Sequence, residues 1–308
     1  MSLKVLFMGT PQFAVPILKS IYDSNHTVLS VYTQPPKKKD RGQNKNITPV
    51  HEVSNKINLE VRHPEFLDEN EIQYIKNLKP DIVVVVAYGK ILPTKLLNLK
   101  KIKFINVHAS LLPKLRGAAP IQRAIMNLEK ETGISIMKIE PKLDTGPILM
   151  KSKVKISQET NYTDLSDKLS QLGSELIINS LELIYKKKDE YLPQEENKAT
   201  YAKKITKEES KIYWNIKAKN LIAKINALNP NPGCWFELQG SRVKVTRAIE
   251  VKLSGKPGFI LDNKLTVGCS ENAIQILELK KKGKKLLKAN DFLKGNKLEI
   301  GHNLNSHV

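Results

Sequence analysis

The sequence predicts an α/β protein in two parts: a doubly wound, mostly parallel sheet covered by helices, and a smaller C-terminal β-barrel. Strand and helix signals alternate over the first 185 residues, which is typical of a parallel sheet built from βαβ units. Beyond residue 210, short strands recur at regular spacing with turn residues between them, which favours a small barrel. The length of 308 residues is sufficient for two domains.

The first part begins with a strand, a turn and a helix. Residues 5–8 form a short apolar run that ends in Gly9-Thr10-Pro11, as expected for a strand followed by a turn. Apolar residues recur near helical spacing from 13 to 21, which predicts a helix. The Val-rich residues 81–87 indicate a strand that is buried on both faces. Further strands are expected at 26–32, 59–61, 103–107, 133–140 and 148–156, and helices at 49–57, 70–78, 118–128 and 165–185.

The C-terminal part follows a polar stretch, residues 186–209, that has no clear period. A helix is expected at 218–228. Strands are expected at 234–238, 243–249, 258–261, 265–268 and 274–279. The sequence therefore predicts a first domain over residues 1–189, a linker over 190–209 and a C-terminal domain over 210–308.

A net charge of +20 is the main compositional feature. A balance this basic is typical of proteins that bind a polyanion, although Lys and Asn are abundant throughout and can raise the charge without such a partner. After residue 209 there are 18 Lys and Arg against 7 Asp and Glu, so the last third is the most basic per residue. The Lys-rich run at 280–288 fits either a nucleic-acid contact or a solvated face.

No feature of the sequence predicts a membrane segment or a metal site. Apolar runs stay well below the roughly 18–20 residues of a membrane span, and the first residues enter a strand instead of a signal peptide. Cys234 and Cys269 form no CxxC pair or metal-ligand set, so we expect two small buried residues. We expect a cytoplasmic protein, and a monomer because no interface pattern is evident.

The strand at 103–107 ends in a candidate catalytic pair. Side chains alternate along a strand, so Asn106 and His108 lie on one face of its end. An amide and an imidazole side by side can donate to a developing oxyanion. In a doubly wound sheet, ligands bind beyond the carboxyl ends of the strands, which places this pair in one crevice with residues 9–11 and 88–92. Gly9-Thr10-Pro11 is not a GxGxxG motif, so we do not expect a dinucleotide site.

Asp144 is the third candidate and lies in a turn between two expected strands. An Asp in such a turn often only bonds its own backbone. Together with Asn106 and His108, however, it completes an acid–base set that needs neither a metal nor a covalent nucleophile. A carboxylate beside an imidazole stabilises the protonated ring, which suits stabilising a negative oxygen and moving protons.

At this point the residues resemble a known family, the methionyl-tRNA formyltransferases. The resemblance covers almost the whole chain in the right order. The matching segments are residues 8–14, 86–93, 106–108, 110–113, 116–122, 143–146, 200–202 and 229–235. Asn-x-His with a later Asp is shared by enzymes that use formyltetrahydrofolate, whereas the Gly-Ala-Ala-Pro-Ile-Gln run at 117–122 is more selective.

The resemblance implies a Rossmann-like formyltransferase domain, an OB-like C-terminal barrel, and 10-formyltetrahydrofolate as formyl donor. The acceptor would be methionine on initiator tRNA. Asn106, His108 and Asp144 would be the catalytic set. The residues implied to contact folate are Ser110, Leu111, Leu112 and Pro113, with Tyr88, Gly89, Ile91 and Leu92 around the pteridine.

The resemblance also implies a basic loop after the second strand that reaches the tRNA acceptor stem. Residues 34–49 occupy that place. The family usually has a Gly-Arg-Gly-Lys-Lys-like centre, whereas this chain has Lys37, Lys38 and Lys39 before Asp40-Arg41-Gly42. We therefore expect tRNA contacts at Arg41 and these lysines. Lys207 in the linker fits a further tRNA-contact position.

Two alternatives are open from the sequence. One keeps the donor and changes the acceptor: a sugar-amine formyltransferase or a formyltetrahydrofolate hydrolase. The linker, the basic barrel and the 117–122 run argue against it. The other is an inactive tRNA-binding module, against which the intact Asn106, His108 and Asp144 argue, because binding alone does not need them.

Overall fold

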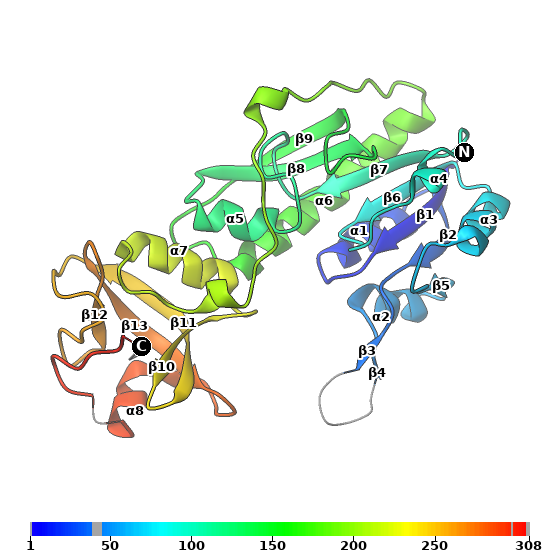
Figure 1. Cartoon of the computed structure of the whole chain (residues 1–308). Coiled ribbons are helices and arrows are strands. Elements are labelled where there is room, and N and C mark those ends of the chain that lie inside the picture. The colour runs from blue at the N-terminus through cyan, green and yellow to red at the C-terminus, as the bar shows by residue number, and fades with distance from the viewer. Residues whose placement is uncertain (1, 39–44, 297, 306–308) are drawn as a thin grey trace. The chain divides into compact units, whose positions relative to one another are not determined.

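The computed structural model describes residues 2–38, 45–296 and 298–305. The chain divides into two compact units (Figure 1). The first comprises Met1–Pro120, Thr132–Val154 and Ser166–Ala202. The second comprises Ile121–Glu131, Lys155–Leu165 and Lys203–Val308. Within the described ranges, no helix is long and apolar enough to cross a membrane.

A mostly parallel sheet forms the centre of the first unit, which confirms the predicted fold class. Its strands in the described residues follow the order β5-β2-β1-β6-β7-β8-β9. Those from β5 to β7 run parallel, and β8 pairs antiparallel with β7. The bounds are β1 Lys4–Gly9, β2 Thr27–Tyr32, β5 Val61–Arg62, β6 Ile82–Val86, β7 Lys103–His108, β8 Glu131–Lys138 and β9 Ile148–Lys155.

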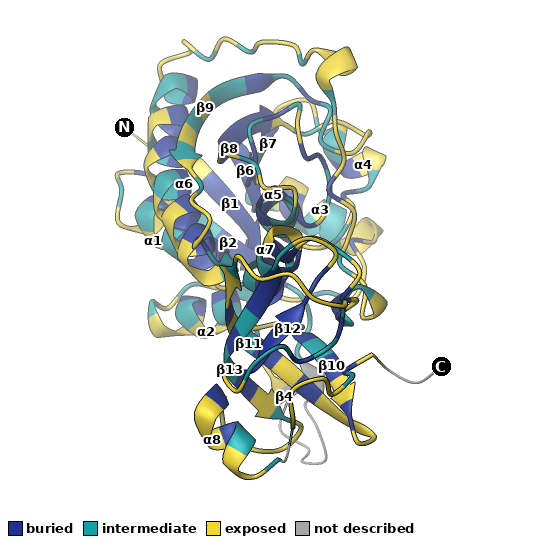
Figure 2. Ribbon diagram, turned by 90° about the vertical axis from the view of Figure 1, so that its left-hand side faces the viewer, coloured by how far each residue is buried: buried dark blue, intermediate teal, exposed yellow. Residues whose placement is uncertain are grey.

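Helices cover the sheet because its central strands are apolar on both faces. Every residue of β6 is buried, and Figure 2 colours β1 and β6 as buried while α6 keeps an exposed outer side. Gly173 of α6 allows close packing, since a Cβ there would lie 3.1 Å from Ile17 and 3.3 Å from Val107. The helices of this unit are α1 Ala14–Tyr22, α2 Pro49–Lys56, α3 Glu69–Leu78, α4 Thr94–Leu97 and most of α6 Tyr162–Tyr185. Apart from Pro120, α5 Pro120–Met126 belongs to the second unit.

Alternation along β7 divides its side chains between the two faces of the sheet. Phe104 packs into the cluster that holds Ile75 of α3 and Leu96 of α4, whereas Val107 faces α6. Asn106 and His108 share the parity of Phe104 and therefore lie on the α3/α4 face, at the carboxyl end of the strand. The fold thus delivers both side chains to the edge where ligands bind in such sheets.

The second unit is built on an antiparallel sheet, as predicted for the C-terminal part. In the described residues its strands follow the order β10-β11-β13-β12, with β14 paired to β13. Register shifts in β11 after Val245 and Arg247 increase the local twist and curl the sheet. Its bounds are β10 Cys234–Leu238, β11 Ser241–Val251, β12 Thr266–Gly268, β13 Ala273–Lys281, β14 Leu287–Lys288, α7 Ala218–Leu228 and α8 Ala289–Lys294.

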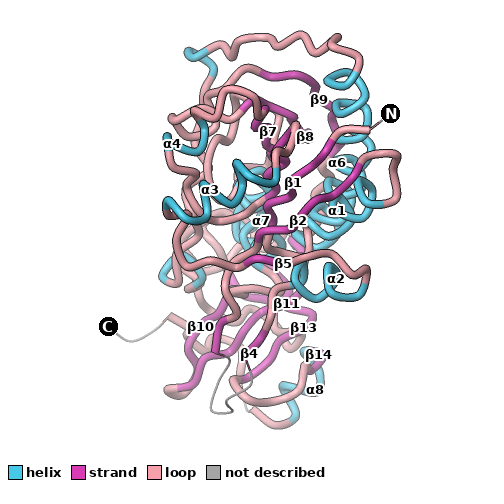
Figure 3. Tube along the Cα trace, turned by 90° about the vertical axis from the view of Figure 1, so that its right-hand side faces the viewer, coloured by secondary structure: helices cyan, strands magenta, loops and turns pink. Residues whose placement is uncertain are grey.

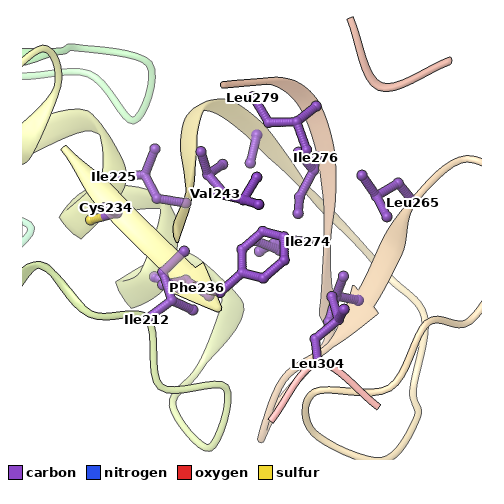
Figure 4. Close-up of a cluster of buried hydrophobic side chains, with 14 of the residues drawn as sticks. Ile212, Ile225, Cys234, Phe236, Val243, Leu265, Ile274, Ile276, Leu279 and Leu304 are labelled. Atoms are coloured by element: carbon purple, nitrogen blue, oxygen red, sulfur yellow. The ribbon is translucent and has the colours of Figure 1, made fainter. Parts of the chain in front are cut away.

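A single apolar cluster fills the curl of this sheet. Figure 4 shows Phe236 of β10 between Ile212 and Ile274, with Leu279 and Leu304 closing the cluster. These side chains come from segments far apart in the sequence, so their packing fixes the segment around Leu304 onto the sheet.

Two sequence predictions about local structure differ from the observed elements. The stretch 34–49, expected as a loop without regular structure, contains β3 (Lys37–Lys38) paired antiparallel with β4 (Lys45–Asn46). The strand expected at 258–261 is absent from the described elements, and only single bridges form there, from Phe259 and Ile260. Pro257 lacks an N–H, and Gly258 has a φ of +83°, so neither can continue a ladder.

Candidate active site

The carboxyl ends of β1, β2 and β6 are tied together by one carbonyl group. The backbone carbonyl oxygen of Tyr88 accepts from Thr10 Oγ1 at 2.8 Å and from Gln34 Nε2 at 3.2 Å. Ala87 and Gly89 flank it with φ values of +46° and +82°, so the chain turns sharply as it leaves β6. These hydrogen bonds link the three strand ends at the edge where a ligand would approach.

His108 ends β7 and is buried, with 5% of its surface exposed. Its Nε2 lies 3.0 Å from the carbonyl oxygen of Leu115. A carbonyl only accepts, so Nε2 carries the proton and donates. Leu115 has a φ of +59°, which turns its carbonyl back toward the strand end.

Asp144 lies on the other side of the imidazole, with Oδ2 3.6 Å from Nδ1 of His108. The same oxygen accepts from the backbone N–H of Gly117 at 2.8 Å. Asp144 has a φ of +51°, a conformation that Asp tolerates better than most residues. The two ring nitrogens of His108 thus face two oxygen atoms: the Leu115 carbonyl at hydrogen-bonding distance and the Asp144 carboxylate slightly further away.

Of the three catalytic candidates, His108 and Asp144 are brought together, and Asn106 shares the strand face with His108. Asn106 is half-buried and lies two residues before His108, the last residue of β7. The arrangement offers an amide donor, an imidazole and a carboxylate at one edge of the sheet. Such a set can stabilise an oxyanion and move protons without a metal.

The folate candidates that follow β7 form a loop that is held by hydrogen bonds to Ser135 of β8. Its Oγ donates to the Ser110 oxygen at 2.7 Å and accepts from the N–H of Leu112 at 3.0 Å. Ser110 is buried, and its Oγ donates to the oxygen of Lys114. Its side chain therefore shapes the loop, whereas Leu111 and Pro113 are only half-buried.

The folate candidates that follow β6 include one strongly exposed apolar side chain. Ile91 is 91% exposed and Gly89 is exposed, whereas Tyr88 and Leu92 are buried. Burial raises the pKa of Tyr88 to about 12, with the nearby Glu71 carboxylate adding to the effect. Lys90 donates to the oxygens of Pro64 and Glu65 at 2.5 Å, and burial lowers its pKa.

The tRNA-contact candidates lie in two places. Lys37 and Lys38 form β3, and Lys39 and Arg41 lie outside the described residues. Lys207 is exposed and precedes a short 3-10 helix at Glu208–Ser210.

Sequence reasoning missed the backbone partners of the catalytic candidates. The Leu115 carbonyl and the Gly117 N–H contact His108 and Asp144 directly. Any residue type can supply a backbone group, so the sequence does not reveal these partners. The one indication is the glycine at 117, where the backbone has a φ of +118°. Gln194 was also missed, because it lies in a polar stretch without periodicity.

Two family models match the chain over separate ranges. The model described as Formyl transferase matches residues 1–181, and the one described as Formyl transferase, C-terminal domain, matches residues 204–297. The first alone spans more than half of the sequence.

Curated relatives match nearly the full length. A methionyl-tRNA formyltransferase of Pelagibacter ubique is 49% identical over 304 residues, covering 98% of each chain. One from Paramagnetospirillum magneticum is 41% identical and covers 97% of this chain and 99% of its own. Among solved structures, HypX from Aquifex aeolicus in complex with tetrahydrofolic acid shares the fold, with a TM-score of 0.63, 18% identity, and coverage of 95% of this chain and 47% of that chain. These matches, joined with the His108–Asp144 geometry, confirm the resemblance seen in the sequence: the chain belongs to the methionyl-tRNA formyltransferase family.

Proposed function

We propose that this protein transfers the formyl group of 10-formyltetrahydrofolate to the α-amino group of methionine on initiator tRNA, giving N-formylmethionyl-tRNA. The observation that carries the proposal is the full-length identity of 49% to a relative named for this activity. The placement of His108 against Asp144 at the ligand edge of the sheet supports it.

The reaction we propose is a direct transfer. The α-amine of an aminoacyl ester is more acidic than a free α-amine, whose pKa is about 7.7–8.0, so much of it is neutral and nucleophilic. Its nitrogen attacks the formyl carbon and a C–N bond forms. The carbonyl oxygen becomes an oxyanion, which Asn106 stabilises by donating a hydrogen bond and the protonated His108 stabilises through its positive charge, because both of its ring nitrogens already face protein oxygens.

Two proton movements complete the transfer. The attacking nitrogen loses a proton to water held by Asp144. The folate N10 takes up a proton, its bond to the formyl carbon breaks, and tetrahydrofolate leaves. Asp144 also balances the charge of the imidazolium during the oxyanion step.

The donor would lie along the two loops that follow β6 and β7. These loops leave neighbouring parallel strands at the same edge of the sheet. Leu111, Pro113, Gly89 and Ile91 are the members of the folate set with exposed surface. Ser110, Leu112, Tyr88 and Leu92 would act by shaping the loops.

The division of labour we propose gives catalysis and the basic loop to residues 1–189 and further tRNA binding to residues 210–308, with 190–209 connecting them. The separate matches at 1–181 and 204–297 support this division. Lys37, Lys38, Lys39, Arg41 and Lys207 would contact tRNA phosphates. We further propose that the protein works in the cytoplasm and is a monomer. Sedimentation of the purified protein would test the oligomeric state.

The decisive experiment offers 10-formyltetrahydrofolate with charged initiator methionyl-tRNA, and with charged elongator methionyl-tRNA as control. Transfer to the initiator alone is the expected result. No transfer to either tRNA, from folded protein that still binds folate, would contradict the proposed acceptor and redirect the assay to amino sugars and to hydrolysis.

A further inference from the structure

Residues 190–202, here called the strap, belong to the first unit although their sequence reads as a linker. Figure 3 draws this stretch, which follows α6, as loop apart from one short helical turn. Its backbone is nevertheless anchored at both ends. Leu192 exchanges two hydrogen bonds with Ile148, at 2.8 and 2.9 Å. Arg116 donates to the Thr200 oxygen at 2.8 Å and accepts from Ala202 at 2.7 Å.

Gln194, in the middle of the strap, bonds the turn that carries Asp144. Its Nε2 donates to the backbone oxygens of Asp144 at 2.9 Å and Gly146 at 2.7 Å. Its Oε1 accepts from Nε and Nη2 of Arg116, at 3.1 and 2.9 Å. Both amide hydrogens and both lone pairs are thus engaged, so the side chain is held in one orientation.

Arg116 determines that orientation. Its side chain is fully buried, and Glu196 binds it through two hydrogen bonds of 2.9 Å. These bonds are the main reason that the pKa of Arg116 is raised above its ordinary value. A guanidinium has donors only, so it must face the oxygen of Gln194, and the amide nitrogen must face the two carbonyls.

The strap also fixes the other neighbour of His108. Thr200 Oγ1 accepts from the N–H of Leu115 at 2.9 Å, and the carbonyl of Leu115 is the acceptor for His108 Nε2. One segment therefore holds both oxygen atoms that flank the imidazole: the Leu115 carbonyl through Thr200, and the Asp144 carboxylate through Gln194.

We propose that the strap is a positioning element of the catalytic centre, with Gln194 as the positioning residue that sets the Asp144 carboxylate against His108. The inference deepens the proposed function and rests on it for the roles of His108 and Asp144. Neither Gln194 nor Arg116 is assigned a contact with either substrate.

The variant Gln194→Glu tests this proposal with little change in shape. A glutamate keeps the one oxygen that accepts from Arg116 but replaces the amide donor by an oxygen that repels the carbonyls of Asp144 and Gly146. A displacement of about 1 Å can cost on the order of 100-fold in rate. We therefore expect kcat to fall by about 10- to 100-fold, with KM for both substrates unchanged within about threefold.

Asn197→Glu is the matched control, because it adds the same charge to an exposed position of the strap. It should leave kcat, KM and Tm unchanged. A loss of kcat in Gln194→Glu that is matched by Asn197→Glu would assign the effect to charge and overturn the proposal.

A double-mutant cycle with Asp144→Asn separates positioning from general stability. If Gln194 acts through Asp144, then Gln194→Glu costs little further activity once the carboxylate is gone. If the two losses multiply, Gln194 acts elsewhere and the proposal fails.

Hydrogen exchange at the Gly117 amide gives a readout that needs no activity. This N–H donates to Asp144 Oδ2, so displacing the carboxylate should speed its exchange by about tenfold or more in Gln194→Glu. Unchanged exchange would overturn the proposal even if the wild-type protein formylates methionyl-tRNA. If the Gly117 amide exchanges faster in Gln194→Glu but the wild-type protein has no formylating activity, the positioning role stands while the proposed function fails.

Discussion

The backbone N–H of Gly117 and Nδ1 of His108 converge on the same oxygen, Oδ2 of Asp144, at 2.8 and 3.6 Å. The amide fixes where the oxygen lies, and the charge acts on the imidazole. Substitution by Asn retains an oxygen for Gly117 and removes the charge, so it isolates the electrostatic contribution.

Asp144→Asn should lower the rate of formyl transfer by about 10²–10⁴-fold, the range of general acid–base contributions, and His108→Ala should do the same. Initiator tRNA binding should persist in both, because neither side chain is assigned to the tRNA. Single-turnover transfer and a filter-binding titration measure the two properties. Near-full activity in either variant would refute the assigned roles.

Gly117→Ala should destabilise the protein by about 2 kcal/mol or more. A φ of +118° is strained for any residue with a Cβ, at roughly 1–3 kcal/mol, and the added Cβ would lie 2.8 Å from the Ala202 oxygen. Gly240→Ala is the control, since its φ is +70° and no atom lies within 4 Å of the new Cβ. Urea unfolding should show the smaller loss in Gly240→Ala; equal losses would mean that the strap yields freely at Ala202.

Tyr88→Phe should leave stability unchanged or raise it by about 1 kcal/mol. The Tyr88 hydroxyl is buried and, in the described part of the chain, has no hydrogen-bond partner, and such a group costs about 1–3 kcal/mol. Tyr32→Phe is the matched comparison, because its hydroxyl donates to Glu71 at 2.8 Å, and it should lose about 1.5–3 kcal/mol. Thermal unfolding of both variants decides; a higher KM for the donor in Tyr88→Phe would instead assign the hydroxyl to folate.

Neither cysteine should react readily with a thiol reagent at pH 8. Burial raises the pKa of Cys234 to about 12 and that of Cys269 to about 11, and only the thiolate is nucleophilic. Both should react at least about 100-fold faster once urea unfolds the chain. The raised pKa values also make the free energy of unfolding depend on pH. The contribution of the buried thiols is complete below about pH 9 and declines above it, because the thiols of the unfolded chain ionise first.

tRNA affinity should fall steeply between 50 and 200 mM salt, as expected when phosphates are neutralised. Lys207→Ala should lower affinity and reduce the slope of log K against log salt by about 1. Lys100→Ala, another exposed lysine, is the control and should change neither. A slope near zero for the wild-type protein would remove the electrostatic account of tRNA binding.

The sequence predicts those parts of the site that depend on local pattern. Asn106 and His108 follow from alternation in a strand whose apolar residues are continuous with the core. Asp144 was recognised as a turn residue, but its approach to His108 depends on how β7 and β8 pair. Gln194 and the strap leave no such pattern, since their hydrogen bonds go to backbone carbonyls of distant loops. The prediction of a strand at 258–261 was wrong for a related reason. Apolar residues predict burial, and Ile260 is buried, but they do not show whether the backbone forms a continuous ladder.

The left-handed backbone conformation of Asp144 limits which amino acids this position can accept, in a natural or a designed sequence. Glycine, asparagine and aspartate adopt that conformation at lower cost than most residues, and of these only aspartate is anionic. Glutamate would keep the charge yet strain the main chain and carry the carboxylate one methylene further. At this position the polypeptide conformation and the acid–base chemistry select the same amino acid, so a substitution matrix that ranks glutamate as conservative misjudges it.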